Sequence, residues 1–103
     1  MAKLQTPWGI AETVTPVATG IDAVETASHG GYRLSSARWA DLLRIAPDFT
    51  PFGGNVGWLE EDCDWAVLYF MCPSLFPAGA EEHARNTAEF MAARHPAWKA
   101  FLS

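Results

Sequence analysis

The chain has 103 residues, of which half are hydrophobic and 18% are charged, so a disordered chain is excluded and one globular domain over residues 1–103 is predicted. Twelve acidic residues outnumber seven Lys and Arg, and the basic residues are scattered, so the net charge of −5 argues against direct binding to nucleic acid. No apolar run approaches the roughly 18 residues that span a bilayer, and the first residues lack the apolar core of a signal peptide. We therefore expect a soluble, cytoplasmic protein with no membrane contact.

The first third of the chain predicts antiparallel strands. Residues 10–17 and 21–26 are rich in β-branched side chains and are separated by Gly20, and two further glycines precede a short run over residues 32–34. Short β-rich runs punctuated by glycine are typical of a meander of antiparallel strands.

A helix and a loop follow these strands. Ser35 or Ser36 can cap a helix whose apolar positions recur at helical spacing until Pro47 ends it. Residues 48–57 are interrupted by glycines, which predicts a loop and the most mobile segment of the chain.

Two more helices are expected in the C-terminal half. Residues 60–72 predict a helix buried in the core, because the run 65–72 is apolar all round, and Pro73 ends it. An amphipathic helix over residues 80–94 follows, and Pro96 separates it from a short aromatic tail.

Strands first and helices after them predict an α+β fold. We expect a small antiparallel sheet from the N-terminal half, covered on one face by about three helices, with the helix of residues 60–72 in the middle. Core packing then explains three of the five Trp residues, Trp8, Trp39 and Trp65.

Acidic residues concentrate at one point of the chain. Glu60, Glu61, Asp62 and Asp64 lie within five positions, directly before the apolar run. In the first turn of a helix they would lie at the surface, where the exposed amides and the helix dipole favour each carboxylate by about 0.3 to 1 kcal/mol. Trp58 precedes them, and an exposed aromatic side chain beside charges is the usual composition of a binding patch, although a Trp at the edge of a core is at least as common.

A metal site is the first alternative for this cluster. Glu60 and Asp64 are one helical turn apart, and His29 from a glycine-rich turn could complete a set of oxygen and nitrogen ligands. The helix start explains the same acids without any ligand, so we expect no metal and no cofactor. A metal-assisted hydrolase that uses His29 with these acids remains the alternative function.

A cysteine nucleophile is the second alternative. A helix start lowers the pKa of a thiol, and His29 could act as the base for Cys63, but the carboxylates around Cys63 disfavour the thiolate. We expect an inert Cys63 and no catalytic residue. The segment around His29 reads as a tight turn, which we predict to lie beside the acidic cluster, with His29 bonded to one of its carboxylates.

Several short motifs recur in the order and spacing of a known domain. They are Thr6-Pro7-Trp8-Gly9, Gly20-Ile21, Ser28-His29-Gly30-Gly31, Leu34-Ser35, and Trp58 followed by Glu60-Glu61-Asp62-Cys63-Asp64-Trp65-Ala66. Over residues 6–98 the chain resembles a domain family of phage, plasmid and other mobile-element proteins, for which no activity is established. The resemblance implies a mobile-element protein in a bacterial cytoplasm, where short acidic products often inhibit host defence.

The residues and the resemblance together predict binding rather than catalysis. We expect a small acidic interaction protein, an inhibitor of host defence comparable to an anti-CRISPR, that meets a partner protein with a basic surface. The predicted binding residues are Trp58, Glu60, Glu61, Asp62, Asp64 and His29.

Overall fold

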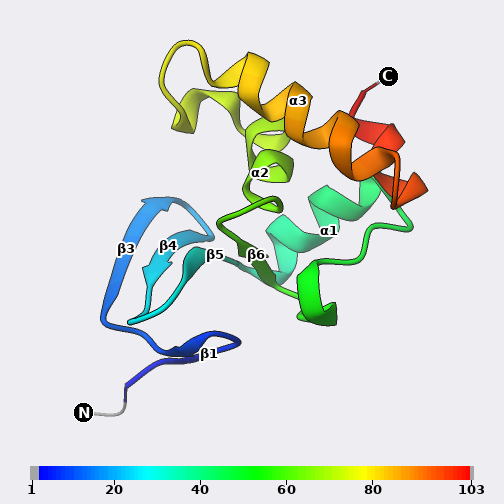
Figure 1. The fold of residues 1–103 in the computed structure, drawn as a ribbon. Coiled ribbons are helices and arrows are strands. Elements are labelled where there is room, and N and C mark those ends of the chain that lie inside the picture. Colours follow the sequence, from blue (N-terminus) through cyan, green and yellow to red (C-terminus); the bar gives the residue numbers. More distant parts are fainter. Residues whose placement is uncertain (1–2, 103) are drawn as a thin grey trace.

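The computed structural model describes residues 3–102 and shows two antiparallel sheets next to a group of helices (Figure 1). The first two strands form a sheet of their own, β1 (Gln5–Thr6) with β2 (Gly9–Ile10). The main sheet has four strands in chain order, namely β3 (Thr13–Ala18), β4 (Ile21–Glu25), β5 (Gly30–Leu34) and β6 (Trp58–Glu60).

The other regular elements among residues 3–102 are three α-helices and three 3₁₀ turns. The helices are α1 (Ser36–Ile45), α2 (Trp65–Met71) and α3 (Ala80–Ala92), and the 3₁₀ turns are η1 (Phe52–Gly54), η2 (Pro73–Leu75) and η3 (Pro96–Phe101). The predicted α+β class is confirmed. Within residues 3–102, no helix combines the length and the apolar character needed to cross a membrane.

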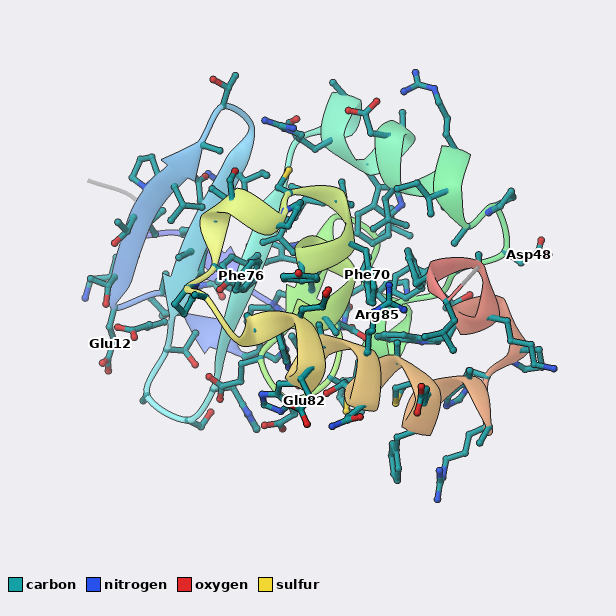
Figure 2. All side chains as sticks on the ribbon, turned by 90° about the horizontal axis from the view of Figure 1, so that it is seen from above. Glu12, Asp48, Phe70, Phe76, Glu82 and Arg85 are labelled. Carbon is teal, nitrogen blue, oxygen red and sulfur yellow. The ribbon has the colours of Figure 1, made fainter. Side chains whose placement is uncertain are left out.

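The main core lies between one face of the four-stranded sheet and the helices. Ile21, Leu34 and Leu59 point from the strands into it and meet Leu42 of α1 and Leu68 of α2. Burying one such side chain contributes about 1.5 to 3 kcal/mol. Aromatic rings fill the remaining space between sheet and helices (Figure 2), among them Phe76, which packs edge-on against Tyr32 of β5 with ring centroids 6.4 Å apart.

The opposite face of the sheet is covered by the turn between β1 and β2. Trp8 lies in this turn and packs against Gly31, where an added Cβ would come within 2.5 Å of the indole ring. The Trp8 ring also meets Trp58 edge-on, with ring centroids 5.6 Å apart. The prediction that core packing explains Trp8 is therefore wrong, because Trp8 closes the second face of the sheet. Trp39 belongs to the core cluster, and Trp65 is partly buried against it.

The capping residue, the proline stop and the amphipathic pattern in the sequence predicted α1 and α3 correctly. The Ser35 hydroxyl accepts a hydrogen bond from the Arg38 N–H at 3.2 Å and caps α1, which ends at Ile45, two positions before Pro47. The predicted helix 80–94 is α3, two residues shorter at its end.

The predicted helix over residues 60–72 is wrong in its first part. Glu60 ends strand β6, which pairs with β5, and α2 begins only at Trp65. Leu59 alternates into the core as a strand residue, and the Glu60 side chain folds back onto the turn that follows. Glu60 was expected in the first turn of this helix, but it pairs with β5 as the last residue of a strand.

Candidate functional site

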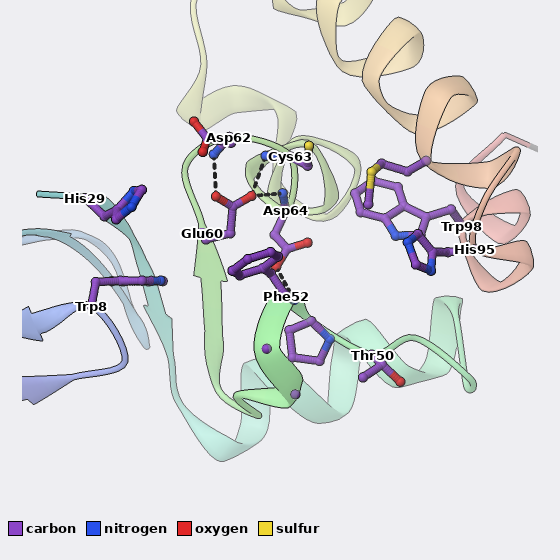
Figure 3. Close-up of a pocket in the computed structure, with 14 residues that line it drawn as sticks. Trp8, His29, Thr50, Phe52, Glu60, Asp62, Cys63, Asp64, His95 and Trp98 are labelled. Atoms are coloured by element: carbon purple, nitrogen blue, oxygen red, sulfur yellow. Dashed lines mark hydrogen bonds between the residues drawn. The ribbon is translucent and has the colours of Figure 1, made fainter.

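Glu60 organises the turn between β6 and α2. Its carboxylate accepts hydrogen bonds from the backbone N–H groups of Asp62 at 2.8 Å, Cys63 at 2.5 Å and Asp64 at 3.2 Å (Figure 3). Hydrogen bonds to a charged group each contribute about 1.5 to 3 kcal/mol, and here they replace the water that the buried carboxylate has lost. Glu60 was expected at the surface, but its role in the structure is to hold this turn.

Asp64 is the most buried acid of the cluster, with 2% of the residue exposed. Its Oδ2 accepts a hydrogen bond from the Phe52 N–H at 2.8 Å, which fastens the 50–57 loop to the start of α2. The pKa of Asp64 is raised to about 6, mainly by burial and in smaller part by the negative charge of Glu60, against the lowering effect of backbone hydrogen bonds from Phe52 and Glu60. Asp64 therefore changes its charge just below neutral pH, whereas an exposed Asp would not.

A cavity of about 710 Å³ opens beside these two acids (Figure 3). This volume lies within the range of pockets that bind small molecules or side chains. The residues that line it come from five separate segments and are Trp8, His29, Thr50, Pro51, Phe52, Gly53, Gly54, Glu60, Asp62, Cys63, Asp64, Met91, His95 and Trp98.

The turn that contains His29 lies beside the acidic cluster, as predicted. The Glu61 N–H donates to the Gly30 carbonyl oxygen at 3.0 Å, which joins the two segments. His29 Nδ1 lies 3.8 Å from Glu61 Oε1, and about half of each side chain is exposed. The partner of His29 is thus the surface acid Glu61, at ion-pair distance and beyond hydrogen-bond reach.

Cys63 lines the cavity as a protonated thiol. Burial raises the pKa of Cys63, and the negative charges of Glu60, Asp64 and Asp62 raise it further. A thiolate is the nucleophilic form of cysteine, so these surroundings oppose nucleophilic catalysis.

The metal alternative finds no converging ligand set in the described part of the chain, since no three His, Cys, Asp or Glu side chains there are placed to hold an ion. Glu60 also has its oxygens engaged by backbone donors. The metal-assisted hydrolase stays a prediction that a thermal-shift scan with divalent cations tests.

The predicted binding residues divide into three groups. Glu60, Asp62, Asp64 and His29 line the cavity, Glu61 pairs with His29 at its edge, and Trp58 lies away from it, half-buried against Trp8. The cavity residues that sequence reasoning missed include Trp8, Phe52, His95 and Trp98. The sequence shows Trp8 and Trp98 as aromatic residues, but no pattern in it predicts that residues so far apart in the chain line the same cavity.

Fold and site define an α+β domain with an acidic and aromatic cavity, formed where the edge strand β6, the 50–57 loop and the C-terminal segment meet. The chain belongs to the family described as "Domain of unknown function (DUF7007)", whose family model matches residues 1–103. No curated protein and no solved structure matches the chain.

Proposed function

We propose that this chain is a small acidic binding protein that docks the face around its cavity onto a basic surface of a partner protein. The observation that carries the proposal is the cavity itself, with buried carboxyl groups inside and exposed acidic and aromatic side chains around it. The net charge of −5 supports the same partner, because charge complementarity speeds encounter and selects among partners.

The charged part of the proposed docking face is Glu61 and Asp62, which are the exposed members of the acidic cluster. Glu60 and Asp64 point inward and are bonded to the backbone, so they act on the turn and on the cavity rather than on the outer surface. The acidic surface is thus smaller than the sequence implied, and it adjoins a cavity.

The apolar part of the docking face is the 50–57 loop. Phe52 is 70% exposed and Val56 is 69% exposed, the two highest values among the large hydrophobic residues described as exposed. An exposed aromatic side chain next to a pocket is the kind of residue that dominates the energy of protein interfaces.

We further propose that the chain is a phage, plasmid or other mobile-element product that acts in a bacterial cytoplasm and inhibits host defence, as an anti-CRISPR does. The resemblance to mobile-element proteins supports this. Defence proteins that bind nucleic acid keep Lys and Arg side chains for phosphates, and an acidic domain can occupy such a surface.

The proposal is tested by capturing the partner from host lysate with the tagged chain and measuring its affinity for charge variants. We expect the double variant Glu61→Gln/Asp62→Asn to bind about tenfold more weakly at low salt, with a smaller salt dependence, because two steering charges are removed. The matched control is Glu81→Gln/Glu82→Gln, which removes two exposed charges from α3, on which Figure 2 labels Glu82. Equal affinity of the two double variants would refute the docking face.

A further inference from the structure

Asp64 lines the cavity with a carboxyl group whose acceptor sites are only partly occupied. Its Oδ2 accepts a hydrogen bond from the Phe52 N–H at 2.8 Å, and a backbone hydrogen bond from Glu60 also lowers the pKa of the group. A carboxylate has about four lone-pair sites, so these two donors leave it capacity to accept further hydrogen bonds. Figure 3 shows one oxygen of this carboxyl group directed towards the side on which Trp98 and His95 lie.

The surroundings of this oxygen select a cation. Glu60 and Asp62 line the same cavity, and no described residue that lines it is a Lys or an Arg. The aromatic residues Trp8, Phe52 and Trp98 also line the cavity. The face of an aromatic ring attracts a positive charge. An anion would meet several carboxyl groups and no fixed positive charge there.

The aromatic lining favours a guanidinium group over an ammonium group. A guanidinium is flat, weakly hydrated and stacks on aromatic rings, whereas an ammonium is a compact, strongly hydrated charge that needs several acceptors. Glu60 already accepts three backbone hydrogen bonds, whereas Asp64 accepts two and keeps capacity for a guanidinium N–H. A cavity volume of about 710 Å³ also leaves room for the backbone of a partner on either side of an inserted arginine side chain.

We infer that the cavity binds the guanidinium group of an arginine supplied by the basic partner, with Asp64 as its counter-ion and the aromatic residues as its walls. This inference rests on the proposed function, because the docking face brings the partner to the cavity. It adds a site of defined chemistry in which a single side chain of the partner enters the protein.

The titration of Asp64 supports the site. A bound guanidinium stabilises the ionised carboxylate, so binding should lower the pKa of Asp64 from about 6 and should tighten as the pH rises from 5 to 7.5. The other titratable groups that face the cavity are Glu60, Asp62, Cys63, His29 and His95. The variant Asp64→Asn isolates the contribution of Asp64 from that of these groups.

The test uses the capped peptide acetyl-Gly-Arg-Gly-amide and NMR titration of the whole protein, followed at the Trp8 and Trp98 indoles. We expect saturable shifts at both indoles and an affinity that falls about 10- to 100-fold in Asp64→Asn, because a charge-assisted hydrogen bond is lost. Glu89→Gln, which removes an exposed charge from α3, is the control and should bind the peptide as the native chain does.

Two further peptides test the ligand. The same peptide with citrulline, which keeps the shape and removes the charge, should bind at least about tenfold more weakly, and the lysine peptide should also bind more weakly. Equal binding of the citrulline or lysine peptide, unchanged binding by Asp64→Asn, or no indole shift up to millimolar peptide would each overturn the arginine site.

The captured partner separates this inference from the docking function. Undiminished affinity of Asp64→Asn for the partner would refute the arginine site and leave the docking face standing. If the partner ignores Glu61→Gln/Asp62→Asn while the arginine peptide still binds at Asp64, the docking function fails and the guanidinium site stands.

Discussion

At the scale of single residues, two acids of one cluster, Glu60 and Asp64, have opposite effects on the stability of the fold. Glu60 stabilises its turn through three backbone hydrogen bonds, whereas Asp64 is buried with a raised pKa. A raised pKa means that the ionised form of Asp64 opposes folding. A buried charge that destabilises the fold and lies beside a cavity is typical of a functional site, because function can preserve a residue that lowers stability.

The variant Asp64→Asn should therefore be more stable than the native chain at pH 7. The folded-state pKa of about 6 lies above the unfolded value of 3.8, so the stability contributed by this group is fully present below 3.8 and is lost as the pH rises through 6. An amide can still accept from the Phe52 N–H, and we expect a gain on the order of 2 kcal/mol at pH 7 that disappears near pH 4. Urea unfolding of both proteins at pH 7 and at pH 4 measures this gain in stability. If the stability of the variant relative to the native chain is lower at pH 7 than at pH 4, the raised pKa of Asp64 is contradicted.

At the scale of elements, strand β5 is the centre of the site. Its residue Gly31 lets β6 and the turn carrying Trp8 approach closely, and the Gly30 carbonyl oxygen accepts a hydrogen bond from the Glu61 N–H. Pairing with β6 is what places Glu60 and the turn after it beside the segment that contains His29.

Replacement of Gly31 by Ala should destabilise the fold. The added Cβ would lie 2.3 Å from the Leu59 carbonyl oxygen and 2.5 Å from the Trp8 ring, so β6 and Trp8 would both have to move. Overpacking of this kind costs about 1 to 3 kcal/mol. The neighbouring change Gly30→Ala is the comparison, since its added Cβ would lie 3.0 Å from the movable Glu61 carboxylate and 3.1 Å from the Val24 carbonyl oxygen, which is tight but milder than at Gly31. Denaturant unfolding should rank Gly31→Ala as the more damaging of the two.

At the scale of the whole molecule, the C-terminal segment closes both the core and the cavity. Trp98 and Phe101 of η3 pack against Phe49, with ring centroids 5.7 and 6.0 Å from it. Trp98 also lines the cavity, so one buried ring links the stability of the fold to the shape of the proposed site.

Truncation of Trp98 to Ala should cost about 3 to 5 kcal/mol, because the indole is 2% exposed and leaves a large void. Phe90→Ala is the matched control, since Phe90 is 54% exposed and its main contact is the Arg94 guanidinium above its ring. We expect the control to cost less than about 1 kcal/mol. Thermal unfolding of the two variants measures the difference, and similar losses would mean that the C-terminal segment is not part of the core.

Sequence reasoning succeeded where the physical signal is local. The cap at Ser35, the stop at Pro47 and the amphipathic period of α3 depend on neighbours a few residues away, and they placed two helices and the α+β class correctly. Charge crowding also predicted that His29 would lie near the acids.

The cavity and the roles of its acids were decided by the tertiary structure. An acidic run before an apolar run is compatible with a helix start, and only pairing of β6 with β5 makes Glu60 a strand end. Asp64 is buried because the 50–57 loop and the C-terminal segment pack around it, and burial depends on residues that no local pattern contains. By itself the sequence determined the α+β class, α1, α3, the net charge and the acidic cluster. The fold determined where β6 ends, which acid lies exposed, which holds a turn and which faces a cavity, since strand pairing and solvation depend on three-dimensional neighbours.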